Sequence, residues 1–148
     1  MSQLLDEILS SENMKLAYKK VKANKGASGI DGITTDEVSE YLKEHWLEIK
    51  EQIKKRKYKP QPVRRVEIPK PNGGVRNLGV PTVVDRIIEQ AIVQKVSPMA
   101  EPYFSDFSYG FRPKRRAQQA VIKLLEYLND GYEYIVDIDL EKFFSLSP

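Results

Sequence analysis

Residues 63–80 read VRRVEIPKPNGGVRNLGV, and this stretch predicts a β-hairpin. Two extended segments flank Asn72-Gly73-Gly74, a strong signal for a tight turn, and in the first of them Arg64, Val66 and Ile68 alternate with Arg65 and Glu67. Lys70 and Arg76 stand on opposite sides of that turn. Lysine offers a point charge and arginine a bidentate fork, so two such cations near one hairpin tip can hold a triphosphate.

The segment around the hairpin is strongly basic. Residues 54–76 contain a single acidic residue, Glu67, and the basic residues Lys54, Lys55, Arg56, Lys57, Lys59, Arg64, Arg65, Lys70 and Arg76. The whole chain has a formal net charge of only +3, so positive charge is concentrated here. Such a block is typical of a surface that binds nucleic acid or the phosphates of a nucleotide.

The composition excludes several other kinds of site. The 148 residues include no cysteine, which rules out disulfides, thiolate zinc sites and thiol nucleophiles. The single histidine, His45, falls in a helical pattern, so acid–base catalysis by histidine is not expected. No apolar run is long enough to span a membrane, and no secretory signal is recognisable. We therefore expect one folded unit of a cytoplasmic protein with no membrane partner.

Most of the remaining chain reads as helix. Apolar residues recur at helical spacing over residues 2–10, 13–23, 38–53, 83–96 and 117–128. Thr34 with Glu37, and Thr82 with Asp85, form capping signatures before the third and fourth of these helices. Ser97-Pro98 is expected to end the fourth helix. Helices combined with a basic hairpin predict an α+β fold.

Two loops have distinctive compositions. Residues 25–32, KGASGIDG, are rich in glycine, so the backbone there can approach another backbone closely. Residues 105–117 interleave aromatic and basic side chains, a mixture that single-stranded nucleic-acid sites use. The same residues can also form a purely structural corner, because Gly110 and Pro113 favour a tight turn. Both interpretations stay open for this loop.

The last residues carry the acidic chemistry. In YIVDIDL, residues 134–140, side chains alternate with the period of a β-strand, which puts Asp137 and Asp139 on one face about 7 Å apart. Paired carboxylates suit a hard cation such as Mg²⁺. The alternative is an edge strand whose acidic face is simply solvated. An unpaired strand edge also favours pairing with another copy of the chain, as a homodimer.

Taken together, these segments resemble the amino-terminal part of a bacterial group II intron reverse transcriptase, also called a maturase. The resemblance rests on four blocks in the family's order: GASGIDGIT at 26–34, YKPQPVRRVEIPKPNGGVRNLGVPTVVDRIIEQAI at 58–92, FSYGFRP at 107–113 and VDIDLEKFF at 136–144. It implies reverse-transcriptase fingers with an N-terminal extension over residues 1–130, and a truncated palm, beginning with its first strand, over residues 131–148.

The resemblance implies roles for residues near the end of the sequence. Asp139 corresponds to the catalytic, metal-binding carboxylate of the palm, and the carbonyl of Leu140 can add a ligand, with Asp137 in support. The family uses two Mg²⁺ ions, whose other carboxylates lie in a Tyr-Ala-Asp-Asp turn that this sequence does not contain. Phe143 and Phe144 are both candidates for the ring that excludes a ribonucleotide's 2′-hydroxyl.

Other residues are implied to bind nucleotide or template. Lys70 and Arg76 correspond to residues that hold the incoming deoxynucleoside triphosphate (dNTP). The implied RNA- and template-binding residues lie in the glycine-rich loop, the hairpin and the aromatic loop: Lys25, Gly26, Ser28, Gly29, Arg64, Arg65, Arg112, Lys114 and Arg115.

The resulting expectation is the N-terminal portion of an RNA-directed DNA polymerase that acts in intron splicing and retrohoming. Its expected partners are intron RNA, an RNA template, a DNA primer and dNTP. With a single metal-binding carboxylate, the 148 residues alone are expected to be catalytically inactive. The alternative is a non-catalytic RNA-binding module that assists splicing of intron RNA. A metal nuclease built on Asp137 and Asp139 is disfavoured, because no histidine or second acidic cluster supports it.

Overall fold

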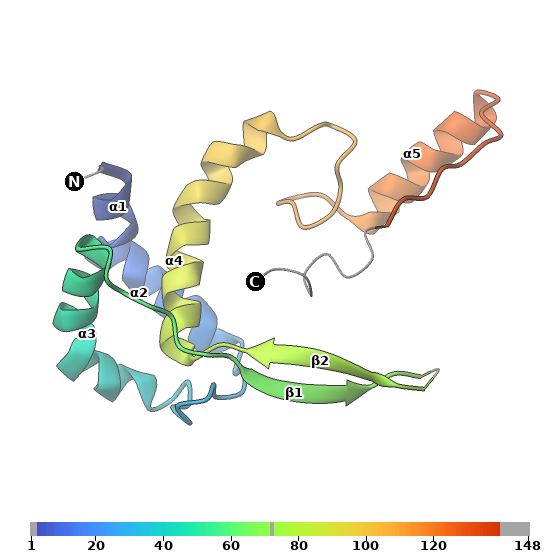
Figure 1. Cartoon of the computed structure of the whole chain (residues 1–148). Coiled ribbons are helices and arrows are strands. Elements are labelled where there is room, and N and C mark those ends of the chain that lie inside the picture. Colours follow the sequence, from blue (N-terminus) through green and yellow to red (C-terminus); the bar gives the residue numbers. More distant parts are fainter. Residues whose placement is uncertain (1–2, 72, 140–148) are drawn as a thin grey trace. The chain divides into compact units, whose positions relative to one another are not determined.

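The computed structural model describes residues 3–71 and 73–139 (Figure 1). Its elements are α1 (Gln3–Ile8), α2 (Ser11–Ala23), α3 (Val38–Lys54), β1 (Arg64–Pro69), β2 (Val75–Val80), α4 (Val83–Ala100), the 3₁₀ turn η1 (Glu101–Tyr103) and α5 (Ala117–Asn129). The two strands form one antiparallel sheet. The expected α+β fold class is therefore confirmed. The chain divides into two compact units, Met1–Pro102 and Tyr103–Pro148.

The core of the first unit lies where α2 packs along α4. Its buried apolar residues are Ile8, Leu9, Met14, Ala17, Val21, Val38, Ile49, Val83, Val84, Ile87, Ile88 and Ala91. Both helices begin with a side-chain cap. The Ser10 side chain accepts the backbone N–H of Asn13 at 3.4 Å, and the Thr82 hydroxyl accepts that of Asp85 at 3.1 Å. These caps satisfy donors that a helix start would otherwise leave unpaired.

A buried asparagine joins the connection between α1 and α2 to α4. Asn13 is only 5% exposed, and its Nδ2 donates to the carbonyl oxygens of Ile8 and Ala91, each at 2.9 Å. Gln94 Nε2 in turn donates to Asn13 Oδ1 at 2.9 Å. A buried amide with this many partners stabilises the packing of the helices, because each buried polar group is satisfied.

The capping signature predicted before α3 is formed. The Thr34 N–H donates to Glu37 Oε2 at 3.1 Å, and the Glu37 N–H donates to Thr34 Oγ1 at 3.3 Å. The hydrogen bonds from Thr34 hold the pKa of the Glu37 carboxyl below its usual value. Helix α3 begins at Val38, one residue after Glu37.

The prediction that Ser97-Pro98 ends α4 is wrong. The helix continues to Ala100, with Pro98 inside its last turn. Proline's fixed φ is compatible with a helix, and the cost of Pro98 is one backbone hydrogen bond, the one that an N–H at this position would donate to the Gln94 carbonyl. None of the helices in the described part of the chain combines the length and apolarity that crossing a bilayer requires.

The second unit buries little of its described surface. α5 contains no buried residue, and its Tyr127 ring lies 6.4 Å from that of Phe107 and 5.8 Å from that of Tyr132. The strand predicted at 134–140 is not formed over residues 134–139, which carry no strand assignment; Leu140 lies outside the described residues. A strand needs a neighbour for its backbone groups, and in the described part β1 and β2 pair only with each other.

Candidate nucleic-acid interface

The predicted hairpin is confirmed, and its tip is closed by two backbone hydrogen bonds. The Gly73 N–H donates to the Lys70 carbonyl at 3.2 Å, and the Lys70 N–H donates to the Gly74 carbonyl at 3.0 Å. Gly73 and Gly74 have φ of 84° and 83°, values that residues with a Cβ rarely adopt. The glycines therefore allow the chain to reverse immediately after Lys70.

The register places Arg76 opposite Ile68, Leu78 opposite Val66 and Val80 opposite Arg64. Residues directly opposite in an antiparallel pair share a face, so this face has apolar side chains between Arg64 and Arg76. We name it the Arg76 face. The same alternation puts Arg65 and Glu67 on the other face.

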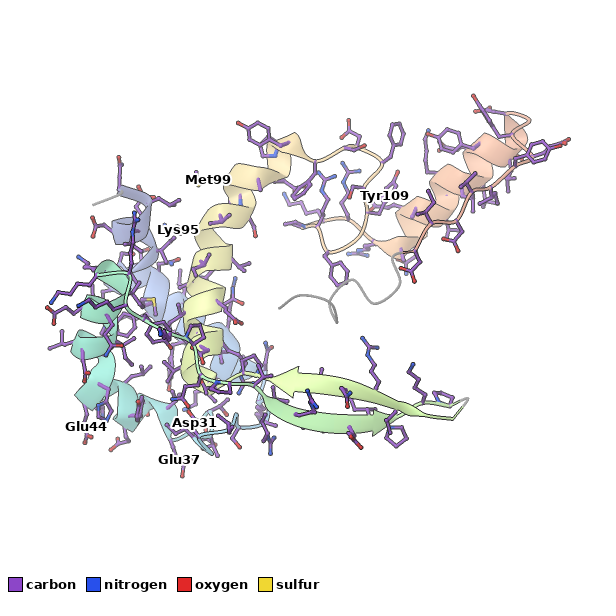
Figure 2. The ribbon with its side chains drawn as sticks, viewed as in Figure 1. Asp31, Glu37, Glu44, Lys95, Met99 and Tyr109 are labelled. Carbon is purple, nitrogen blue, oxygen red and sulfur yellow. The ribbon has the colours of Figure 1, made fainter. Side chains whose placement is uncertain are left out.

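Lys70 joins the Arg76 face when the alternation is continued by two residues beyond Ile68. Lys70 pairs with Gly74, so Lys70 and Arg76 are diagonal neighbours about 7–8 Å apart, a separation that long side chains bridge. Arg64, Arg65, Lys70 and Arg76 are all exposed. Within residues 3–71 and 73–139 none of these four side chains has an ion pair or hydrogen bond. Figure 2 shows side chains standing out from both sides of the hairpin.

The base of the hairpin is held by the carboxylate of Asp85, which is 3% exposed. Its Oδ1 accepts the Tyr58 hydroxyl at 2.6 Å, and its Oδ2 accepts the Gln61 N–H at 3.1 Å and the Thr82 hydroxyl at 2.7 Å. Burial and the hydrogen bond to Asp85 raise the pKa of the Tyr58 phenol above its ordinary value. One buried side chain on α4 thus binds the chain both before β1 and after β2.

The glycine-rich loop lies against the same helix start. A Cβ on Gly29 would lie 2.6 Å from Thr82 Cα and 2.7 Å from Thr82 N, so only glycine fits. Arg86 Nη2 donates to the Ala27 carbonyl at 2.6 Å, and a Cβ on Gly26 would meet the end of that guanidinium. Close packing therefore accounts for glycine at both positions, 26 and 29. Template binding by Gly26 and Gly29 stays a prediction, as it does for Lys25, which is exposed, and for Ser28, which is partly exposed.

The aromatic loop uses two of its arginines to close on itself. Arg112 Nη1 donates to the carbonyl oxygens of Ser105 and Ser108. Arg115 donates to the Asp106 backbone carbonyl at 3.1 Å and to Asp106 Oδ1 at 3.3 Å.

Their guanidinium groups also lie over aromatic rings, Arg112 5.3 Å from the Phe104 centroid and Arg115 5.7 Å from that of Tyr109. The structural corner that the sequence left open is therefore formed. RNA binding by Arg112 and Arg115, and by the exposed Lys114, stays a prediction.

The described residues do not make up a metal centre. Asp137 and Asp139 are exposed on a segment without strand pairing, and within the described ranges no group of three potential metal-binding side chains comes together. The carboxylates present are too few to hold Mg²⁺ without further ligands. Leu140, Phe143 and Phe144 lie outside the described residues.

Asp85 and Arg86 are the site residues that sequence reasoning missed. Thr82-x-x-Asp85 was recognisable as a helix-capping signature, and the cap is present. The contacts of Asp85 with Tyr58 and of Arg86 with Ala27 span 27 and 59 residues. No local pattern reports contacts of that separation.

The family model described as reverse transcriptase (RNA-dependent DNA polymerase) matches residues 68–146, more than half of the chain. The matched span begins within β1 and runs through the hairpin tip, α4, the aromatic loop and Asp139.

Curated relatives cover nearly the whole chain. Protein YkfC of Escherichia coli K12 is 32% identical over 148 residues, which are 96% of this chain and 39% of that protein. Group II intron-encoded protein LtrA of Lactococcus lactis subsp. cremoris is 34% identical over 144 residues, 97% of this chain and 24% of LtrA. The putative COX1/OXI3 intron 2 protein of Saccharomyces cerevisiae is 32% identical over 136 residues, 90% of this chain and 15% of that protein.

The chain thus spans well under half the length of each of these relatives. The matches confirm the resemblance predicted from the four sequence blocks. The chain belongs to the reverse transcriptase (RNA-dependent DNA polymerase) family and corresponds to the N-terminal part of a group II intron-encoded reverse transcriptase or maturase.

Proposed function

We propose that this chain provides the template- and nucleotide-binding fingers of an RNA-directed DNA polymerase that acts in intron splicing and retrohoming. The observation that carries this proposal is the Arg76 face of the hairpin. Lys70 and Arg76 lie there as diagonal neighbours, exposed and without ion pairs in the described part of the chain. Two unpaired cations at one tip are an arrangement suited to phosphate.

Lys70 and Arg76 hold the phosphates of the incoming dNTP in this proposal. Val66, Ile68 and Leu78 supply apolar surface beside them, since they share the Arg76 face. A nucleotide has an apolar base and an anionic triphosphate, and the face offers both kinds of contact. Glu67, on the other face, does not compete for the two cations.

The RNA template and the DNA primer lie along the rest of the basic surface. Arg64 and Arg65 are exposed at the base of the hairpin, and Lys55, Arg56, Lys57 and Lys59 are exposed in the segment that precedes it in the sequence. In the first unit, Lys25 and Ser28 of the glycine-rich loop also bind template in this proposal. In the second unit, Arg112, Lys114 and Arg115 of the aromatic loop do so. The fingers cover residues 1–130 and the palm begins at 131, in a cytoplasmic protein.

Catalysis needs the palm. Members of this family use divalent metal ions, and Asp139 with the Leu140 carbonyl would contribute ligands for Mg²⁺ in a palm that supplies the remaining carboxylates. Phe143 or Phe144 would select against the ribose 2′-hydroxyl. The 148 residues by themselves are inactive in this proposal, because one carboxylate cannot organise two ions. Primer extension by the purified 148-residue chain would contradict that statement.

A binding experiment tests the nucleotide site directly. Titration of the chain with dNTP and Mg²⁺, followed by amide chemical shifts, should perturb Lys70, Gly73, Gly74 and Arg76 first. Perturbation spread evenly over residues 54–76 would instead indicate a nonspecific polyanion surface.

A non-catalytic RNA-binding module for intron splicing is the second candidate. It is favoured by the exposed basic side chains of residues 54–76, among them Arg64, Arg65, Lys70 and Arg76. Such a module should prefer its cognate intron RNA at high salt, whereas a template track should show a steep salt dependence and little preference. A homodimer formed through the strand edge predicted at residues 134–140 belongs to either candidate, and sedimentation of the chain tests it.

A further inference from the structure

We propose that the first turn of α4 positions the two nucleic-acid-binding elements of this unit, with Asp85 acting on the hairpin and Arg86 on the glycine-rich loop. The inference rests on the proposed function, because it assigns a purpose to holding these two elements at fixed places. Asp85 and Arg86 are positioning residues, since both act through the elements that they hold.

Asp85 binds both ends of the hairpin with one carboxylate. Gln61 and Tyr58 belong to the segment that enters β1, and Thr82 belongs to the segment that leaves β2. The carboxylate is 3% exposed, so water does not compete for these hydrogen bonds. A charged acceptor also makes each bond stronger than a neutral one would be.

The hairpin has few other means of holding its direction. Among the described residues its two strands pair with no third strand, and both faces are largely exposed; such a hairpin is only marginally stable without support. Six residues of strand span about 20 Å, so a tilt of about 10° at the base moves the tip by about 3.5 Å. A displacement of that size exceeds the tolerance of a binding site. The hydrogen bonds at the base therefore determine where Lys70 and Arg76 lie.

Arg86 performs the corresponding task for the glycine-rich loop. Its Nη2 donates to the Ala27 carbonyl at 2.6 Å, and Gly26 lies beneath the same guanidinium. The neighbouring Gly29 packs on the backbone of Thr82, the residue that caps α4. Adjacent side chains on one helical turn thus hold two elements separately.

Distance measurements between spin labels test the two halves independently. The chain has no cysteine, so introduced cysteines are the only labelling sites. Val75→Cys on the hairpin, 54% exposed, pairs with Val93→Cys on α4, 52% exposed. Ile30→Cys, 54% exposed, reports on the glycine-rich loop against the same Val93→Cys.

Asp85→Ala should broaden the 75–93 distance distribution and leave the 30–93 distribution narrow, and Arg86→Gln should do the reverse. Asp85→Asn should restore most of the 75–93 order, because asparagine keeps one acceptor oxygen and can donate to the Tyr58 oxygen. Asp36→Asn, an exposed acid on the same unit, is the matched control and should change neither distance.

If the 75–93 distance distribution is unchanged in a folded Asp85→Ala chain, Asp85 does not position the hairpin. If the 30–93 distance distribution is unchanged in Arg86→Gln, Arg86 does not position the glycine-rich loop. If Asp85→Ala does not fold, Tyr58→Phe decides in its place, because it removes one hydrogen bond and keeps the Thr82 cap. Broadening in that variant supports positioning by Asp85, and no broadening contradicts it.

Ligand binding separates this inference from the proposed function. Asp85→Ala should weaken dNTP binding several-fold more than it weakens RNA binding, and Arg86→Gln should do the opposite. A role in stability alone would lower the melting temperature and leave both affinities equal at temperatures where the chain is folded. If the unsubstituted chain shows no dNTP binding at the hairpin tip, the proposed function fails, while the label distances still decide whether α4 positions the two elements.

Discussion

The Tyr58 hydroxyl donates a 2.6 Å hydrogen bond to Oδ1 of Asp85 and so joins the segment before β1 to the first turn of α4. The carboxylate is buried and also accepts the Gln61 N–H and the Thr82 hydroxyl. This relationship makes the base of the hairpin part of the helical core, although the hairpin itself extends into solvent (Figure 1).

The Tyr58–Asp85 hydrogen bond should give stability that disappears in alkali. The pKa of Tyr58 is raised in the folded chain, whereas an unfolded tyrosine titrates near 10. Above about pH 10 the folded state therefore holds a proton that the unfolded state has lost, and stability falls as pH rises. The free energy of unfolding in urea, measured for the original chain and for Tyr58→Phe, should differ most below pH 10 and converge above it. A difference that stays constant from pH 8 to pH 11 would contradict this, and Tyr103→Phe, at an exposed tyrosine, is the control.

Gly29→Ala should destabilise the first unit by about 1–3 kcal/mol. The added methyl group would enter the Thr82 backbone, which cannot move without disturbing the start of α4. Gly26→Ala should cost less, because its methyl group would meet only the flexible end of Arg86. Urea denaturation of both variants measures the contrast, and equal losses would show that close backbone approach is not the reason for Gly29.

Asn13→Ala should lower the free energy of unfolding by about 2 kcal/mol. The substitution leaves the buried Ile8 and Ala91 carbonyls without the donor that both now share. Asn24→Ala is the matched control, since the side chain at Asn24 is exposed, and should change stability by less than about 0.5 kcal/mol. Similar effects in the two variants would mean that Asn13 does not hold α4 against the α1–α2 connection.

Arg64→Ala and Arg65→Ala should each weaken binding of single-stranded RNA and reduce its dependence on salt. A cation that neutralises one phosphate contributes about 0.7 to the slope of log affinity against log salt, so each variant should lose about that amount. Fluorescence anisotropy across a salt series measures the slope. Lys43→Ala removes a cation that is paired with Glu40 on α3 and should leave the slope unchanged. If Lys43→Ala reduced the slope as much as Arg64→Ala does, the change would reflect the overall charge of the chain and not a phosphate contact at Arg64.

The features predicted correctly from the sequence are those with local causes. The turn at Gly73 and Gly74 depends on the conformational freedom of glycine, and the cap at Thr82 on a hydrogen bond to a residue three positions away. Both can be seen in a short window. The end of α4 was misplaced because proline's fixed φ is compatible with a helix, so Pro98 costs one backbone hydrogen bond without ending α4.

Features that depend on distant partners were not predictable. Alternation in residues 134–139 is compatible with a strand, but a strand forms only against a neighbour, and the described residues contain none for it. Arg112 and Arg115 are hydrogen-bonded within their own loop, and RNA binding by them stays a prediction. The contacts of Asp85 with Tyr58 and of Arg86 with Ala27 join residues far apart in the sequence, so no local pattern predicts them.

The proposal that Lys70 and Arg76 hold the phosphates of dNTP is tested most directly by comparing dNTP and RNA binding in Lys70→Ala and Arg76→Ala. Both variants should bind dNTP with Mg²⁺ roughly tenfold more weakly, about the worth of one charge-assisted hydrogen bond. RNA affinity should change far less, because many other cations contact that polymer. Chemical-shift titration gives the dNTP affinity and anisotropy gives the RNA affinity. A selective loss of dNTP binding is the expected result, and an equal loss of affinity for both ligands would contradict a nucleotide site at Lys70 and Arg76.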